Sequence, residues 1–244
     1  MASPPVGSRT VVVPMYREAG RISRSVVALR GSDLHSPTVE LLFVDDGSDD
    51  ATIEVLEEAL ETTGLQASVL RQDVNKGKGS AVRAGMLKAR GGAVAFTDAD
   101  LSTPPADVVR ALEVVESGAA DVVVATRTHS ASRIPVPQPT LRRLSGKCFN
   151  LVLRLLRLAP MRDTQCGLKA FTAAAAHSLF AELITEGFSF DVEVLLRARR
   201  LGLRVVELPV EWSHFEDSRV RPLADSLRML VDVIALRLRL RRQL

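Results

Sequence analysis

Short runs of apolar residues, many of them valines, alternate along the chain with segments in which apolar residues recur at helical spacing. The apolar runs predict strands at 10–14, 39–45, 67–71, 93–97, 121–126 and 204–210. The periodic segments predict helices at 21–29, 51–62, 80–89, 106–116, 141–158 and 192–200. Strands that read as continuous apolar runs and alternate with helices are typical of a mainly parallel sheet with helices on both faces. We therefore expect an α/β fold.

One proline-rich segment interrupts this alternation. Residues 128–140 contain three prolines and have no apolar period. The segment therefore predicts a long surface loop, and loops of this length usually carry function or move.

The composition is that of an ordinary globular protein. Of the 244 residues, 46% are hydrophobic and 25% are charged, which excludes a disordered or fibrous chain. Two cysteines are too few for a disulfide framework and fit a reducing compartment. No apolar signal segment opens the sequence, and no uncharged apolar stretch approaches the roughly 18 residues of a membrane span. We therefore expect a cytoplasmic protein that is not embedded in a membrane.

Positive charge is concentrated near the C-terminal end. Residues 218–244 include seven arginines and two aspartates, whereas the chain as a whole has a net charge of only +3. Apolar side chains recur there at helical spacing, at Leu223, Leu227, Leu230, Val231, Ile234 and Leu238. We therefore expect a main domain, 1–222, and a basic amphipathic helix, 223–244, that lies on the cytoplasmic face of a membrane. The alternative is a helix that packs back on the main domain.

A nucleic-acid partner is disfavoured by the same pattern. Only 4% of the residues are aromatic, and no basic stripe is found outside the C-terminal segment.

Acidic residues follow two of the predicted strands. In open parallel sheets, ligands bind beyond the carboxyl ends of the strands. Asp98 and Asp100 end one strand at a spacing that lets both carboxylates face a single hard cation, which prefers oxygen ligands. The alternative is that they cap the following helix. The presence of Asp45 and Asp46 at the end of another strand favours a metal site.

Two further segments suit a nucleotide. Asp45 is a candidate acceptor for a base or ribose, while Asp46 and Ser48 are expected to shape the turn. Residues 75–80 place glycines and two lysines before a helix, which suits a diphosphate, although the segment matches no standard phosphate-loop fingerprint and by itself could be a flexible turn.

No hydrolase chemistry is indicated. The four histidines have no metal-ligand spacing, and no nucleophile elbow occurs. Cys166 lies in a polar break at 163–169 and has no histidine partner in sequence, so we expect a small buried residue there.

Taken in order, these motifs resemble family 2 glycosyltransferases of GT-A fold, a Rossmann-like nucleotide-sugar-binding fold. The resemblance extends over about residues 10–236 and is closest to the polyprenyl- and dolichyl-phosphate β-glucosyltransferases, with dolichyl-phosphate mannose synthases next. The motifs are Pro14-x-Tyr16-x-Glu18, Val44-Asp45-Asp46-Gly47-Ser48, Asn75-Lys76-Gly77-x-Gly79, Asp98-x-Asp100, the 163–169 segment, Phe188-x-Phe190-Asp191-x-Glu193 and Glu207-x-Pro209-Val210-x-Trp212.

The resemblance implies roles for individual residues. Those expected to bind the nucleotide sugar are Pro14, Tyr16, Glu18, Asp45, Lys76, Gly77, Asp98 and Ala99. Those expected to hold Mg²⁺ or Mn²⁺ are Asp98 and Asp100. Those expected near the reacting sugar and the diphosphate are Asp163, Gln165, Asp191, Glu193, Arg127 and Arg219. Those expected to face the acceptor phosphate are Arg127, Arg133, Arg142 and Arg143.

The implied reaction is an inverting transfer of a hexose from a nucleotide sugar to a polyprenyl or dolichyl phosphate. Ser102 stands where mannose-phosphate synthases tend to have a glutamine metal ligand, which favours UDP-glucose over GDP-mannose. A phosphate acceptor is already anionic at neutral pH and needs no general base. The alternatives are a GDP-mannose-dependent enzyme, a family 2 enzyme with a hydroxyl acceptor in which Asp163 or Asp191 is the base, and a scaffold without activity.

Overall fold

The computed structural model describes residues 8–140 and 163–215, together with positions 146, 151, 153, 161, 231–233, 235 and 236. The elements in chain order are β1 (Arg9–Met15), α1 (Ile22–Arg30), β2 (Val39–Asp45), α2 (Thr52–Thr63), β3 (Ser68–Arg71), α3 (Lys78–Lys88), β4 (Ala93–Phe96), α4 (Pro105–Glu116), β5 (Val122–Thr126), β6 (Lys169–Thr172), α6 (Ala173–Ala181), α7 (Phe190–Arg200) and β7 (Val205–Pro209). All six predicted strands are confirmed, and so are the predicted helices apart from 141–158. That helix lies largely outside the described residues, and its three described positions, 146, 151 and 153, are helical.

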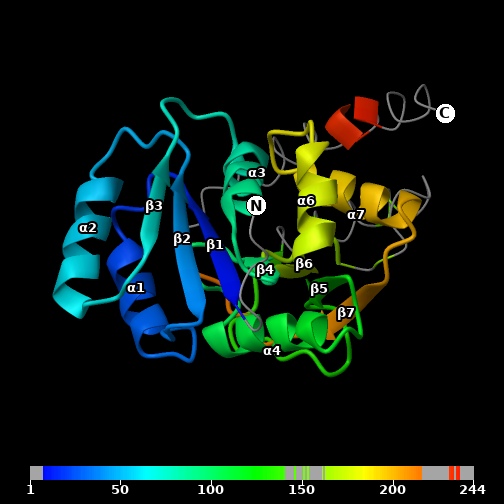
Figure 1. Ribbon diagram of the computed structural model, residues 1–244, viewed down its shortest axis with the longest axis horizontal. Coiled ribbons are helices and arrows are strands. Elements are labelled where there is room, and N and C mark those ends of the chain that lie inside the picture. Colours follow the sequence, from blue (N-terminus) through cyan, green and yellow to red (C-terminus); the bar gives the residue numbers. More distant parts are fainter. Residues whose placement is uncertain are drawn as a thin grey trace.

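The strands form one mainly parallel sheet in the order β3-β2-β1-β4-β6-β5-β7, which confirms the expected α/β class (Figure 1). Neighbouring strands are parallel except at β6, which runs antiparallel to both β4 and β5. β5 and β7 therefore run in the same direction as β1 to β4. As a result, the carboxyl ends of six strands and the start of β6 lie at one edge of the sheet.

Alternate strand residues face two separate cores, as the strand period requires. Val11 and Val13 pack on one face with apolar residues of α1, α2 and α4. Val12 packs on the other face with residues of α3, α6 and α7. Four phenylalanine rings of that second core lie against one another, at Phe96, Phe171, Phe180 and Phe190. Helices therefore cover both faces, as predicted.

Local signals explain several helix boundaries. α4 begins at Pro105. Proline is suited to the first turn of a helix, because backbone N–H groups there form no hydrogen bond within the helix and proline has no N–H. α2 ends at Gly64, whose φ of 67° lies in the left-handed region that glycine adopts freely. Residues 128–139 form a mostly exposed loop without a regular element, apart from a single bridge between Arg133 and Glu211, and residue 140 is helical. The predicted surface loop is confirmed.

The described part of the C-terminal segment is helical and contacts the main domain. Ser189, which precedes α7, donates a hydrogen bond to the Asp232 carboxylate at 3.0 Å. Val233 and Leu236 are buried, whereas Val231 is 60% exposed. These helical residues lie near α6 and α7 in Figure 1. The described helical residues therefore contact the main domain through Asp232, and Val231 faces solvent. The other residues of the predicted apolar face, Leu223, Leu227, Leu230, Ile234 and Leu238, lie outside the described residues.

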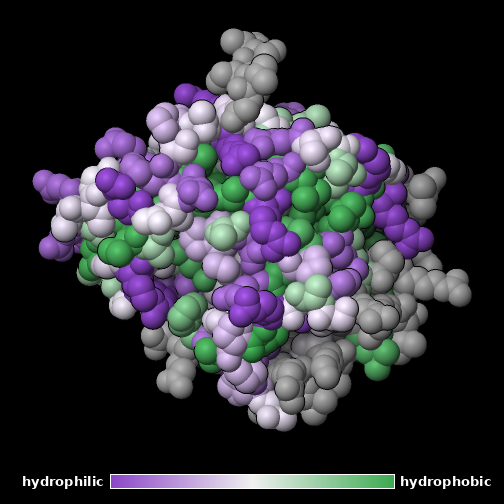
Figure 2. All heavy atoms as spheres, turned by 90° about the horizontal axis from the view of Figure 1, so that it is seen from below, coloured by the Kyte–Doolittle hydropathy of each residue, from purple (hydrophilic) through white to green (hydrophobic). Residues whose placement is uncertain are grey.

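The surface seen from below in Figure 1 is mixed in character. Hydrophilic and hydrophobic side chains are interspersed over the described part of that face (Figure 2). This is the ordinary pattern for a globular protein, in which apolar atoms contribute much of the exposed surface. Within the described residues, the structure has no helix that is both long enough and apolar enough to cross a bilayer.

Candidate active site

The strand directions bring the predicted site residues to one edge of the sheet. Asp45 ends β2, Asp98 and Asp100 follow β4, and Arg127 follows β5. Because β6 is antiparallel, the 163–169 segment that leads into it reaches the same edge. Gly167 lies so close to Asp98 that a Cβ on this glycine would clash with the Asp98 carboxylate. Segments far apart in sequence therefore meet at Asp98.

Lys78, the first residue of α3, donates a hydrogen bond to the Asp98 Oδ1 atom. Burial by itself would raise the pKa of Asp98, but the charge and hydrogen bond of Lys78, together with the charges of Lys169 and Arg127, hold that pKa below its ordinary value. Asp98 is therefore an ionised carboxylate in a cationic setting.

Asp100 has a local bond that shapes the turn after β4. Its Oδ1 atom accepts a hydrogen bond from the backbone N–H of Ser102 at 2.9 Å. Leu101 between them has a φ of 50°, and Arg17 after β1 has a φ of 53°. A non-glycine residue in the left-handed region is uncommon and costs about 1–3 kcal/mol, and such residues gather at functional sites. Both loops therefore hold strained backbone beside the candidate ligands.

The donor set at Asp98 and Asp100 fits a hard divalent cation. Two carboxylates on one turn supply oxygen ligands and leave the remaining coordination positions for water or phosphate oxygens. Within the described residues, no group of three or more His, Cys, Asp or Glu side chains could hold a metal ion. An ion held by Asp98 and Asp100 would take its remaining ligands from water or substrate oxygens, as Mg²⁺ often does.

Arg127 forms a two-pronged ion pair with Asp163. The Arg127 Nε and Nη2 atoms each lie 2.7 Å from an Asp163 carboxylate oxygen, and the Arg127 backbone N–H donates at 3.0 Å. The guanidinium also lies over the Trp212 ring, 5.3 Å from its centroid. Burial opposes ionisation of both groups, but each partner outweighs it, so the pKa of Asp163 is lowered and that of Arg127 is raised. Asp163 therefore positions Arg127.

Lys169 and Asp191 form a second, more deeply buried pair. The Lys169 ammonium donates to Asp191 Oδ1 at 2.6 Å and to the carbonyl oxygens of Thr164 and Cys166. It also lies 5.5 Å from the centroid of the Phe96 ring. Burial raises the pKa of Asp191 and outweighs the opposing effect of Lys169.

The expectation that Cys166 is a small buried residue is confirmed, and burial raises the pKa of its thiol to about 11.

Gln165 carries an unpartnered donor. Its side-chain Nε2 atom is buried and has no hydrogen-bond partner in the part of the chain that the structure describes. A buried donor without a partner is costly, so such a group often marks the place of a ligand. The position of Gln165 between Asp163 and Gly167 fits a contact with a sugar oxygen.

Asp46 anchors the candidate phosphate loop. Its carboxylate accepts hydrogen bonds from the backbone N–H groups of Lys76 at 3.0 Å and Gly77 at 2.8 Å, and from the Asn75 side chain at 3.0 Å. Burial raises the pKa of Asp46 despite these bonds. The sequence predicted only a turn-forming role for this residue. Asp45 accepts from the Ser48 backbone N–H and hydroxyl, so the two aspartates divide their contacts between two loops.

Two acidic residues of the resemblance are held by local partners. Glu18 pairs with Arg21, and its backbone N–H donates to the Thr52 hydroxyl at 2.7 Å. Glu193 is fully buried, and its carboxylate accepts from the backbone N–H groups of Ile184 and Thr185. The structure thus shows protein partners for the carboxylate of Glu193, and its contact with sugar hydroxyls stays a prediction. Glu193 fixes a loop whose Thr185 carbonyl closely approaches Gly79 in α3.

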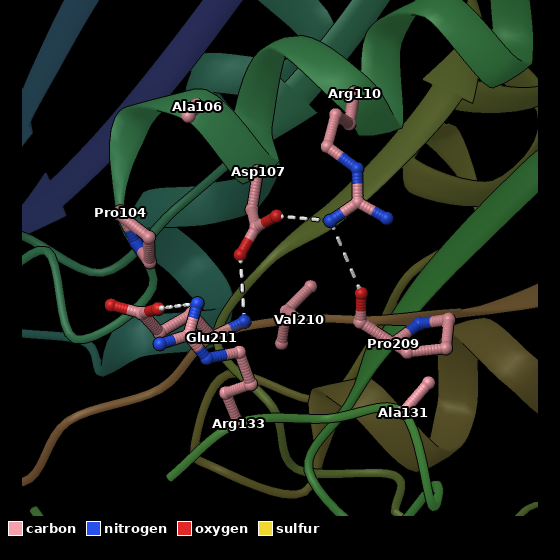
Figure 3. A pocket seen from close by; sticks show the side chains of 9 residues that line it. All are labelled: Pro104, Ala106, Asp107, Arg110, Ala131, Arg133, Pro209, Val210 and Glu211. Carbon is pink, nitrogen blue, oxygen red and sulfur yellow. Dashed lines mark hydrogen bonds and ion pairs between the residues drawn. The ribbon is translucent and has the colours of Figure 1, made fainter. Parts of the chain in front are cut away.

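Arg133 lies in the loop after β5, and its backbone carbonyl accepts a hydrogen bond from the Trp212 backbone N–H at 2.8 Å. Its exposed side chain is 3.6 Å from Glu211 and lines a pocket of about 490 Å³ between the start of α4, the loop after β5 and the segment after β7 (Figure 3). In this pocket Asp107 accepts from Arg110 and from the Glu211 backbone N–H. Neither Asp98 nor Arg127 lines it. Arg142, Arg143 and Arg219 lie outside the described residues.

Pro14 and Tyr16, the remaining residues expected near a nucleoside, lie at the end of β1 and directly after it. Pro14 lies in β1, and Tyr16 follows it with a half-buried ring 5.2 Å from the Arg17 guanidinium carbon. Arg17 in turn pairs with Asp49 beyond β2. Ala99 contributes its carbonyl oxygen, which accepts from the Ser25 hydroxyl at 2.5 Å. These groups border the same sheet edge as Asp45.

Comparison with known proteins gives a consistent picture. Residues 10–180 match the family model described as Glycosyl transferase family 2. The dolichyl-phosphate beta-glucosyltransferase of Saccharomyces cerevisiae is 30% identical over 94% of this chain and 74% of its own length. The protein of that name from Homo sapiens is 32% identical over 96% of this chain and 76% of its own length.

Solved structures agree in fold. One example is glucosyl-3-phosphoglycerate synthase from Mycobacterium tuberculosis in complex with Mn²⁺, UDP-glucose and phosphoglyceric acid. It superposes with a TM-score of 0.69 at 23% identity, over 93% of this chain and 77% of that one.

Proposed function

The chain belongs to glycosyl transferase family 2, and we propose that it transfers glucose from UDP-glucose to a polyprenyl or dolichyl phosphate. Family membership makes the protein a glycosyltransferase. The observation that carries the proposal is the set of paired charges at one sheet edge, in a chain whose named relatives are dolichyl-phosphate beta-glucosyltransferases.

The donor would lie across the loops that follow β1, β2 and β4. Asp45, Tyr16, Pro14 and Glu18 border the nucleoside, and the Lys76–Gly77 backbone, fixed by Asp46, borders the diphosphate. Asp98 and Asp100 would hold Mg²⁺ or Mn²⁺, which when bound would neutralise charge on the leaving diphosphate. Gln165, with its unpartnered amide, would meet the sugar.

The acceptor would be oriented by Arg127. A phosphomonoester is anionic at neutral pH, so its oxygen can attack the anomeric carbon without a base while the bond to the diphosphate breaks and its electron pair leaves with the nucleotide. A single displacement inverts the anomeric configuration. Asp163 is bound to Arg127, and Asp191 to Lys169, so neither carboxylate is a ready base for a hydroxyl acceptor. This pairing favours a phosphate acceptor over a hydroxyl.

A transfer assay with the purified chain tests the donor and the acceptor together. Radiolabelled UDP-glucose with polyprenyl phosphate is expected to give a labelled lipid product, and GDP-mannose is expected to give at least about tenfold less, a difference of about 1.4 kcal/mol in transition-state stabilisation. Unphosphorylated polyprenol is the matched acceptor control and is expected to remain unlabelled. Preferential use of GDP-mannose would reverse the donor assignment, and labelling of polyprenol would reverse the acceptor assignment.

We further propose that the C-terminal helix rests on the cytoplasmic face of a membrane. The supporting features are the arginines of residues 218–244 and an apolar side chain, Val231, that is exposed while its neighbour Asp232 bonds to Ser189. Ile184 and Phe188, close to Ser189 in sequence, are also exposed apolar residues. Such a surface would keep the active site near a lipid-borne phosphate.

Val231→Asp is expected to weaken binding to anionic vesicles by roughly thirtyfold. The change removes an apolar contact and adds a negative charge beside anionic lipid, together about 2 kcal/mol. Vesicle flotation measures the effect. Val27→Asp is the matched control, because Val27 is 59% exposed on α1, far from the C-terminal helix in Figure 1. Equal flotation of the Val231 variant and the wild type would contradict membrane contact through this helix.

A further inference from the structure

Three ion pairs lie at the edge of the sheet that carries the candidate active site, and they differ in the solvent exposure of their side chains. The pairs are Lys78–Asp98, Arg127–Asp163 and Lys169–Asp191. The side chains of Lys169 and Asp191 are 0% and 4% exposed, so this pair has no room to exchange partners. The side chains of Lys78 and Asp98 are 21% and 32% exposed. In the Arg127–Asp163 pair the carboxylate side is only 1% exposed, so Lys78–Asp98 is the pair in which both side chains are accessible to an incoming ligand.

The position of Lys78 links two binding regions. It is the first residue of α3 and directly follows the Lys76–Gly77 backbone that Asp46 fixes. Its ammonium nevertheless reaches across to Asp98 after β4. One lysine thus stands between the diphosphate loop and a candidate metal carboxylate.

The charges of the three pairs cancel before any ligand arrives. The three cations of the pairs match the three carboxylates, and only Asp100 of the candidate metal residues is left over. A divalent cation alone would have to displace the Lys78 ammonium from Asp98 and leave it beside the metal. An arriving diphosphate offers that ammonium a new anionic partner, so the metal and the nucleotide together restore the balance.

We propose that Lys78 is a built-in competitor for Asp98 that makes metal binding depend on the nucleotide diphosphate, so that the two enter as a unit. The inference rests on the proposed function, since it assumes that Asp98 is a metal ligand. By thermodynamic linkage, the factor by which the nucleotide tightens metal binding equals the factor by which the metal tightens nucleotide binding. Lys78 raises this factor by weakening metal binding in the absence of nucleotide.

The experiment titrates the full chain with Mn²⁺ alone and then with Mn²⁺ in saturating UDP, and follows free Mn²⁺ by its electron paramagnetic resonance signal. In the wild type, UDP is expected to tighten Mn²⁺ binding at least about tenfold. In Lys78→Met, Mn²⁺ binding without UDP is expected to tighten about tenfold, so the gain from UDP shrinks. Lys78→Arg retains the charge and is expected to behave as the wild type.

Lys88→Met is the matched control, because it removes an exposed lysine from the last turn of the same helix. It is expected to leave both titrations unchanged. If Lys78→Met and the wild type bind Mn²⁺ equally without UDP, the competition is overturned while the metal site stands. If the wild type binds no Mn²⁺ even with UDP, the metal site of the proposed function is overturned, and this inference with it.

Discussion

Asp100→Asn is expected to lower glucose transfer by about a thousandfold and to leave the fold intact. The Asp100 carboxylate would be one of the two carboxylates that bind the metal. Its loss weakens the stabilisation of the negative charge that develops on the leaving diphosphate. The fold is expected to survive because an asparagine Oδ1 can still accept the hydrogen bond from the Ser102 backbone N–H. Initial rates of transfer and thermal unfolding curves measure the two effects.

Removal of the metal is the companion test for this prediction. Excess chelator is expected to abolish wild-type transfer, and added Mn²⁺ is expected to restore it. Normal turnover by Asp100→Asn, or full wild-type activity in chelator, would contradict a metal role for this residue.

Asp163→Asn is expected to destabilise the protein by about 3–5 kcal/mol, because it leaves the Arg127 guanidinium without its buried counter-charge. Asp163 is almost fully buried and accepts three hydrogen bonds from Arg127. Denaturant unfolding at pH 7 measures the loss. Asp49→Asn is the matched control, since Asp49 pairs with Arg17 on the exposed surface, where such pairs are worth at most about 1 kcal/mol.

The effect of Asp163 depends on pH in a defined direction. Burial would raise its pKa, but Arg127 holds the pKa below its ordinary value of about 3.9. A carboxyl whose folded pKa is lowered stabilises the protein above the unfolded pKa, and this contribution is lost as the pH falls through the folded pKa. The stability difference between the wild type and Asp163→Asn is therefore expected to shrink below about pH 4. A difference that is constant between pH 7 and pH 3 would contradict the ion-pair explanation.

Local patterns predicted most of the framework. The strand predicted at 39–45 coincides with β2. It could be predicted because its signal is a run of apolar residues that are consecutive in the sequence. β6 and α6 were missed. β6 has only four residues, and its antiparallel place is set by pairing with β4 and β5, which are distant in sequence. α6 begins with four alanines and shows little helical alternation of polar and apolar residues.

Several candidate site residues were predictable from their place at strand ends. The rule for carboxyl ends of strands pointed to Asp45, Asp98 and Asp100. The pairing of Lys78 with Asp98, or of Lys169 with Asp191, joins segments 20 or more residues apart, and no spacing in the sequence signals it. The anchoring role of Asp46 was hidden for the same reason, because its partners lie 29–31 residues further along the chain.

The reversed strand β6 also sets the order in which the protein can be completed during synthesis. β1 to β4 pair among themselves and can form a partial sheet as soon as they leave the ribosome, since N-terminal parts fold first. β5 has only later partners, β6 and β7, and β6 must lie between β4 and β5. Of the candidate site, residues 75–80 and Asp98 thus come first, and Arg127 and Asp163 are held in place only when β6 has joined the sheet. A nascent chain stalled before that point therefore lacks the strand pairing that places Arg127, the residue that the proposed function assigns to the acceptor.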